Sequence, residues 1–183
     1  KTKWFIFNSP SNPTGAGYTA DELRGLTDVL MKHPHVWIMS DDMYEHLVFD
    51  DFKFVTPAQI EPGLYDRTLT CNGVSKSYAM TGWRLGYAVW PESLVPHVTR
   101  LCINDHSCVN ASAQFAGLAA LTGPQDAVAE MMVAFNQRRT LIVDALNSLP
   151  GVRCSDAAGA FYAFPHVGGT GLTSRQAQDL FLN

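Results

Sequence analysis

Residues 4–7 spell WFIF and residues 36–39 spell VWIM, and the fold class follows from these two apolar runs. Each run is short and consists of aromatic and aliphatic residues, so each predicts a buried strand. Between the runs, leucines recur on one face of a predicted helix, at Leu23, Leu26 and Leu30. A strand, a helix and a second strand form the unit from which parallel sheets are built. We therefore expect an α/β fold with a mainly parallel sheet.

The same alternation continues along the chain. The first helix begins at a capping box formed by Thr19 and Glu22, and Pro34 ends it. The further predicted elements are strands at residues 68–71, 85–90 and 161–164, an alanine-rich helix at 111–121, and a long helix that starts at Pro124 and stops at Pro150-Gly151.

Composition excludes several classes of protein. The chain has 183 residues, of which 46% are hydrophobic, and its formal net charge is −4. A chain this apolar buries enough surface to fold, and a slightly acidic chain lacks the clustered cations that nucleic acid requires. No apolar run reaches the roughly 18 residues of a membrane span, and no secretory signal is visible. We expect a cytoplasmic protein that binds neither nucleic acid nor membranes.

The four cysteines form no C-x-x-C pair, so reduced thiols are the simplest interpretation. Cys102, His106 and Cys108 are close in sequence, but no fourth ligand is evident, and we expect no metal site. Both ends of the chain look interrupted. There is no initiator Met, and a helical pattern that starts at Ser174 stops at Asn183 without Gly or Pro. We therefore expect a fragment of a longer protein.

Polar residues follow three of the predicted strands. Asn12 comes after the first strand, Asp41 after the second, and Ser75 and Lys76 after the third. Singly, these are an ordinary turn residue, a helix cap and a surface lysine. In an open α/β sheet, however, the carboxyl ends of the strands form one crevice where ligands bind. An amine there can form a Schiff base with an aldehyde, and a carboxylate can keep a pyridine nitrogen protonated.

These residues belong to three longer motifs. Residues 8–15 spell NSPSNPTG, residues 40–46 spell SDDMYEH, and residues 75–87 spell SKSYAMTGWRLGY. In this order and spacing they resemble the class I and II aminotransferases, fold type I enzymes that use pyridoxal 5'-phosphate. The nearest likeness is to bacterial-type aspartate aminotransferases, and it extends over the whole chain.

The resemblance implies a role for each residue of the motifs. Lys76 resembles the catalytic lysine, which forms the internal aldimine and later moves a proton between the substrate α-carbon and the cofactor. Asp41 resembles the partner of the pyridine nitrogen. Asp42 is its rival, but the D-x-x-Y spacing to Tyr44 favours Asp41. Tyr44 and Asn12 resemble the groups that hydrogen-bond the phenolic oxygen of the cofactor.

The resemblance also assigns the phosphate of the cofactor to Arg84, whose guanidinium can bind it as a fork. Many relatives have a phosphate-binding Ser three residues before the lysine, and Gly73 stands there in this chain, so Ser75 is an alternative. Relatives also have a phosphate loop, an aromatic residue that stacks on the ring, and an arginine for the substrate carboxylate. The resemblance places these three features outside residues 1–183, so we expect the chain by itself to be inactive.

For the architecture, the resemblance implies a three-layer sandwich, which is part of the large domain of these transferases. Residues 1–148 would form the carboxyl-terminal half of the cofactor-binding domain with the long connecting helix. Residues 149–183 would begin a small α+β domain. Residues 106–114 resemble a loop and helix near the dimer interface, and an ordinary loop that caps a helix explains them equally well. Residues 159–162 resemble a small-domain strand that faces the substrate cleft, although a core strand is the simpler role for its aromatics.

The expected function is therefore transamination between an amino acid and a 2-oxo acid by a homodimer. Two alternatives remain open. The same scaffold supports other reactions, such as β-elimination, decarboxylation or cyclopropane formation, because the cofactor carries the chemistry. A non-catalytic domain that senses pyridoxal phosphate is the second alternative. The sequence does not identify the amino-acid substrate.

Overall fold

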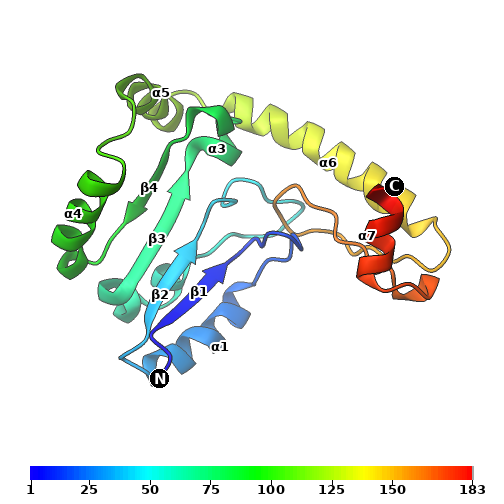
Figure 1. The fold of residues 1–183 in the computed structure, drawn as a ribbon, viewed down its shortest axis with the longest axis horizontal. Coiled ribbons are helices and arrows are strands. Elements are labelled where there is room, and N and C mark those ends of the chain that lie inside the picture. The colour runs from blue at the N-terminus through cyan, green and yellow to red at the C-terminus, as the bar shows by residue number, and fades with distance from the viewer. Residues whose placement is uncertain (183) are drawn as a thin grey trace.

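The computed structural model describes residues 1–182, and its centre is a four-stranded sheet (Figure 1). The strands, in their order across the sheet, are β1 (Trp4–Asn8), β2 (Trp37–Asp41), β3 (Thr68–Gly73) and β4 (Gly86–Val89). The pairs β1–β2 and β2–β3 are parallel, and β3–β4 is antiparallel. The predicted α/β class with a mainly parallel sheet is confirmed.

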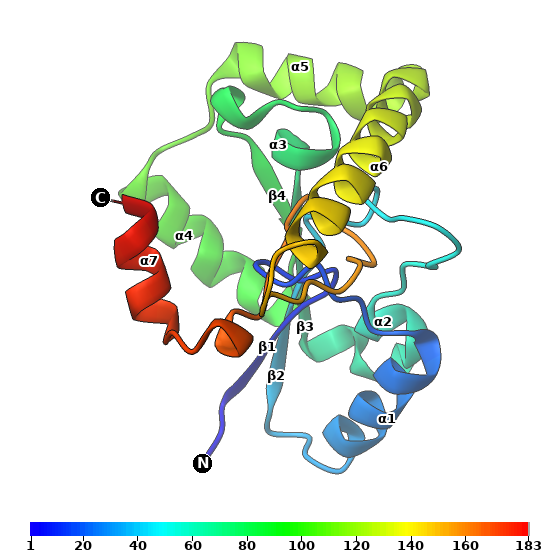
Figure 2. The ribbon, with the colours of Figure 1, turned by 90° about the vertical axis from the view of Figure 1, so that its right-hand side faces the viewer.

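Helices cover the sheet on two sides, and Figure 2 shows α1 and α2 on one face and α4 on the other. The α-helices are α1 (Ala20–Met31), α2 (Pro57–Ile60), α3 (Val74–Ser77), α4 (Val95–Asp105), α5 (Ala111–Thr122), α6 (Asp126–Asn147) and α7 (Ser174–Leu182). Short 3-10 helices are η1 (Pro62–Arg67), η2 (Thr81–Trp83), η3 (Glu92–Leu94) and η4 (Gly168–Thr170). The expected three-layer arrangement is present.

Hydrogen bonds made by polar side chains fix both ends of α1. At its start, the Glu22 backbone N–H donates to Thr19 Oγ1 at 3.3 Å, and the Thr19 N–H donates to Glu22 Oε2 at 2.8 Å. This is the predicted capping box. At its end, the guanidinium of Arg67 donates to the carbonyls of Leu30 (2.7 Å) and Val36 (2.5 Å). A cation at this end also suits the negative pole of the helix dipole.

The two faces of the sheet differ in how well they are covered. Next to α1, one buried cluster joins the helix to β2 and η1; it consists of Leu30, Val36, Ile38 and Leu64 with Phe5 against it. We call this side the closed face. Alternate residues of β1 point to the opposite side, where Ile6 is 70% exposed and Trp4 is 41% exposed. We call this side the open face.

Two sequence predictions need correction. Residues 161–164 are not a strand, because within residues 1–182 this segment has no neighbouring strand to pair with; the nearest pairings are isolated bridges, Val48 with Gly159 and Arg153 with His166. The long helix α6 begins at Asp126 rather than at Pro124. The domain division at residues 148 and 149 stays a prediction. No helix within residues 1–182 is both long enough and apolar enough to cross a membrane.

Candidate active site

The carboxyl ends of β1, β2 and β3 bring polar side chains to one edge of the sheet. Asn8 is paired in register with Asp41, and Asp41 with Cys71. The Asn8 side-chain amide donates to the Asp41 carbonyl at 3.0 Å, and its Oδ1 accepts from the backbone N–H of Asn12 at 2.8 Å. Asn8 therefore links the backbone of Asn12 to the backbone of Asp41. Sequence reasoning missed Asn8, although it is the last residue of β1, as Asp41 is of β2.

Asp41 and Asp42 lie on opposite faces of β2. Asp42 is 3% exposed, and its carboxylate accepts the Ser40 hydroxyl at 2.6 Å. Burial raises the pKa of Asp42 above the ordinary value, against the effect of its hydrogen bonds to Ser40 and Thr56. Asp41 is only half-buried, and its Oδ1 accepts from the backbone N–H of Met43 at 3.2 Å. A ligand at the strand ends can therefore reach Asp41 more easily than Asp42.

Tyr44 lies one turn beyond Asp41 and is buried, with 3% of its surface exposed. Its hydroxyl shares a hydrogen bond with the hydroxyl of Tyr162. The pKa of Tyr44 is raised above its ordinary value, first by burial, then by the hydrogen bond to Tyr162, and then by the charge of Tyr162 and of Asp41. The Tyr44 hydroxyl therefore stays protonated at neutral pH and can donate a hydrogen bond.

Lys76 belongs to α3, which starts directly after β3 and so holds its side chain at the same edge of the sheet. Its Nζ lies 5.6 Å from the ring centroid of Phe161. The same Phe161 ring packs edge-to-face against Tyr44, with 5.7 Å between the centroids. Within residues 1–182 the Lys76 amine has no hydrogen bond or ion pair, so it is available to a ligand.

Arg84 is the predicted site residue that stands apart. It is exposed and has a positive φ of 55°, and its guanidinium donates to the Thr81 carbonyl at 3.0 Å. Thr81 Oγ1 in turn donates to the Ser75 carbonyl at 3.1 Å. These bonds tie Arg84 to the loop that carries Lys76. Among the contacts within residues 1–182, none joins it directly to Asp41 or Tyr44.

Residues 157–162 close over the strand ends from the far end of the sequence. The backbone N–H groups of Ala158 and Gly159 donate to the Gly15 carbonyl at 2.9 and 3.0 Å, and Ala160 N–H donates to the Leu47 carbonyl at 2.8 Å. Gly15 has a φ of +69°, and a Cβ there would lie 2.5 Å from Ala157 Cβ. The close approach of these two segments therefore requires glycine.

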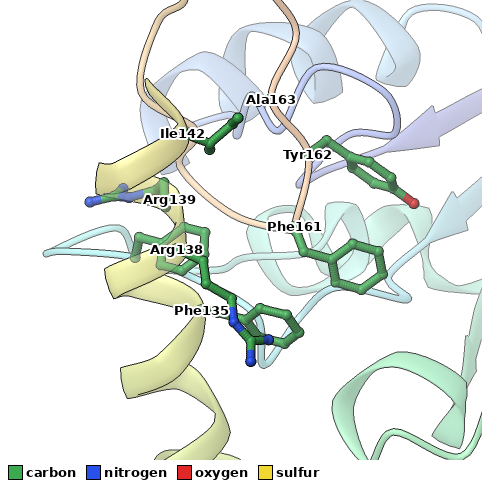
Figure 3. Close-up of a pocket in the computed structure, with 8 residues that line it drawn as sticks. Phe135, Arg138, Arg139, Ile142, Phe161, Tyr162 and Ala163 are labelled. Atoms are coloured by element: carbon green, nitrogen blue, oxygen red, sulfur yellow. The ribbon is translucent and has the colours of Figure 1, made fainter. Parts of the chain in front are cut away.

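A pocket of about 440 Å³ lies between α6 and this closing segment (Figure 3). Phe135 and Phe161 stack with 5.6 Å between their centroids and form part of its wall. Arg139 anchors α6 by donating to the Ala157 carbonyl and to the Asp50 carboxylate, each at 2.8 Å. Figure 3 shows the Tyr162 hydroxyl pointing away from α6. The Phe161 ring thus lines this pocket, and its centroid also lies 5.6 Å from the Lys76 amine.

Two further expectations from the sequence concern other parts of the chain. Asn110 caps α5, because its Oδ1 accepts from the Ala113 N–H at 3.2 Å. The loop therefore has the simpler capping role, and its place at a dimer interface stays a prediction. The part of the chain that the structure describes has no group of three or more His, Cys, Asp or Glu side chains that could hold a metal ion.

Comparison with known proteins gives a consistent result. The model of the family described as aminotransferase class I and II matches residues 1–181. The aspartate/prephenate aminotransferase of Cereibacter sphaeroides is 61% identical over 169 residues, which is 92% of this chain and 42% of that protein. The chain therefore spans less than half the length of this relative.

Solved structures agree with this result. The crystal structure of the aspartate aminotransferase from Rhizobium meliloti superimposes with a TM-score of 0.90 at 52% identity, over 92% of this chain and 42% of that one. The aromatic aminotransferase from Pyrococcus horikoshii superimposes with a TM-score of 0.94 at 36% identity, over 100% of this chain and 48% of that one.

Proposed function

The chain belongs to the class I and II aminotransferases, and from this we propose that its residues serve pyridoxal-phosphate-dependent transfer of an amino group between an amino acid and a 2-oxo acid. One observation carries the proposal. Asp41, Tyr44 and Lys76 all lie at or just after the carboxyl ends of the strands, and the ring of Phe161, whose centroid is 5.6 Å from the Lys76 amine, packs against Tyr44.

The chemistry of these side chains fits pyridoxal phosphate. The site offers an amine that has no hydrogen bond or ion pair within residues 1–182, a half-buried carboxylate, a phenol that stays protonated and an exposed guanidinium. The cofactor has a matching aldehyde, ring nitrogen, phenolic oxygen and phosphate. When bound, pyridoxal phosphate supplies an electron sink for the negative charge that remains after the α-proton of the substrate is removed.

Each residue then has a distinct task. Lys76 would hold the cofactor through a covalent bond of its Nζ and, once released, would move the proton at the substrate α-carbon. The Asp41 carboxylate would accept a hydrogen bond from the protonated ring nitrogen. Tyr44 and Asn12 would hydrogen-bond the phenolic oxygen, and Arg84 would bind the phosphate.

The proposal extends to the protein as a whole. Because the relatives are more than twice as long as this chain, we propose that residues 1–183 act within a longer, cytoplasmic homodimer. In that protein, residues 1–148 would belong to the cofactor-binding domain and residues 149–183 to the small domain. The names of the relatives favour aspartate as an amino donor and give no support to a lyase or a cofactor sensor.

Covalent labelling tests the proposal directly. The whole protein is incubated with pyridoxal phosphate and reduced with borohydride, and its peptides are mapped by mass spectrometry. We expect the pyridoxyl group on Lys76 and none on Lys53, which serves as the matched control. A parallel assay follows conversion of single amino acids to 2-oxo acids. Labelling at another lysine, or no amino transfer with any amino acid, would contradict the proposal.

A further inference from the structure

Tyr162 is not part of any motif that identified the site, yet its hydroxyl meets that of Tyr44. On the basis of the proposed function, we infer that Tyr162 is a positioning residue, which fixes the Tyr44 hydroxyl so that its proton is directed to the phenolic oxygen of the cofactor. The two residues are 118 positions apart in sequence, so only folding brings them together.

The contact between the two side chains is extensive. Besides the hydrogen bond, the rings pack edge-to-face at 5.7 Å with an angle of 80° between their planes. Tyr44 belongs to the same apolar cluster as Leu47 and Ala160, and Tyr162 packs against this cluster. Packing therefore restrains the Tyr44 ring, and the hydrogen bond with Tyr162 restrains its hydroxyl.

The backbone that carries Tyr162 is itself firmly held. Ala160 is fully buried and has a φ of +60°, a conformation that a residue with a Cβ adopts only under constraint. Its N–H donates to the Leu47 carbonyl, and a Cβ on Gly159 would collide with Pro10. The anchors of this segment are thus the loop after β1 and the turn after Tyr44. Tyr162 is consequently placed by the same framework that places the strand ends.

Counting donors and acceptors shows which tyrosine donates the shared hydrogen bond when the cofactor is bound. Each phenol can donate one hydrogen bond through its O–H and can also accept a hydrogen bond on its oxygen. If Tyr44 donates to the cofactor, its oxygen is left to accept, and Tyr162 must be the donor in their shared bond. A hydrogen bond received by Tyr44 polarises its O–H group and strengthens the bond that it donates. Tyr162 would thus stabilise the anionic form of the phenolic oxygen through Tyr44.

The experiment replaces Tyr162 with Phe, which removes one hydroxyl and keeps the ring. In the whole protein loaded with pyridoxal phosphate, the pH at which the visible absorption of the bound cofactor changes is measured for Tyr162→Phe, Tyr44→Phe and the double variant. We expect Tyr162→Phe to raise this midpoint by roughly 0.2 to 0.5 pH, because the anionic oxygen loses support. Tyr44→Phe should raise it more, and adding Tyr162→Phe to Tyr44→Phe should change nothing further. Tyr65→Phe, at a tyrosine that is 61% exposed, is the control and should leave the midpoint unchanged.

A second readout needs no cofactor. In the cofactor-free protein with ¹³C-labelled tyrosine rings, the Tyr44 Cζ resonance should shift in Tyr162→Phe more than that of any other tyrosine. An unchanged midpoint in Tyr162→Phe, an equal rise in the Tyr44→Phe background, or an unmoved Tyr44 resonance would overturn the inference. Failure of the proposed function shows differently, as absence of a pyridoxyl group on Lys76 in the unsubstituted protein.

Discussion

Two adjacent carboxylates, one on the closed face of the sheet and one on the open face, differ in their exposure. On the closed face, Asp42 is 3% exposed and is bound by the Ser40 hydroxyl beside the packed layer of α1. Asp41, the preceding residue, points to the other side of β2 and stays half-buried at the strand end. Since alternate residues of a strand face opposite sides, a step of one residue separates a structural carboxylate from one that a ligand can reach.

The comparison teaches that packing and chemistry are divided between the faces. The closed face contributes the apolar cluster around Ile38 and the polar cap of α1 by Arg67. The open face and the strand ends hold Asn8, Asp41 and Lys76, whose polar groups are only partly buried. Substitutions on the closed face should therefore change stability, and those at the strand ends should change activity.

The largest expected effect concerns the two aspartates. Asp41→Asn should lower kcat of the whole protein by about 1000-fold, because the ring nitrogen loses its anionic partner at the charge-accepting end of the cofactor. Asp42→Asn should change kcat by less than about threefold, because Asp42 is enclosed on the other face. Steady-state kinetics at saturating cofactor measures both. Equal losses in the two variants would show that the faces do not divide the roles.

The next largest effect concerns two isoleucines. Ile38→Ala on the closed face should destabilise the chain by about 2 to 5 kcal/mol, because a fully buried side chain leaves a cavity. Ile6→Ala on the open face, where the side chain is 70% exposed, should cost less than about 0.5 kcal/mol in residues 1–183. Urea unfolding of the chain measures the difference. A comparable loss for Ile6 would mean that the open face is covered.

Two arginines offer a smaller contrast. Arg67→Met removes the side-chain donors to the carbonyls of Leu30 and Val36 and should destabilise the chain by about 1 to 2 kcal/mol. Arg84→Met removes one exposed hydrogen bond to Thr81, so its unfolding free energy should stay within about 0.5 kcal/mol of the unsubstituted chain. The same unfolding experiment measures both variants, and the reverse order would contradict the stabilising role of the Arg67 hydrogen bonds on the closed face.

The smallest effect is a pH dependence. The pKa of Asp42 is raised above 3.8 in the folded chain, chiefly by burial, so the folded state binds this proton more tightly than the unfolded state. As the pH rises from about 3.8 through the pKa of the folded state, Asp42 becomes charged in its buried position, and the free energy of unfolding falls. Above the pKa of the folded state this loss of stability is complete. Asp42→Asn avoids this loss. Relative to the unsubstituted chain, the variant should gain stability over that window, by less than about 1 kcal/mol.

Urea midpoints for the two proteins at a series of pH values check this last prediction. Asp41→Asn is the matched control for the loss of one negative charge. A gain for Asp42→Asn that grows as the pH falls would have the wrong sign and would contradict the burial of the Asp42 charge.

Much of the fold was predictable because it is locally encoded. The apolar runs at residues 4–7 and 36–39 became β1 and β2, and the pattern of Thr19 and Glu22 became a capping box with both reciprocal bonds. Strand periodicity and cap chemistry involve residues within a few positions of one another. The predicted strand at residues 161–164 was wrong for the same reason, since β-propensity cannot supply the neighbouring strand that a ladder requires.

The site divides in the same way between sequence and structure. By itself the sequence determined the family and the polar residues at the strand ends, because motif spacing and strand alternation are properties of short segments. Only the tertiary structure decided which of two adjacent aspartates faces the open side, that Asn8 links Asn12 to Asp41, and that Tyr162 meets Tyr44 across 118 residues. These contacts form when segments that are distant in sequence pack together. Buried glycines allow their close approach, and backbone hydrogen bonds such as that from Ala160 to Leu47 hold them. No local sequence pattern indicates which segments will pack against each other.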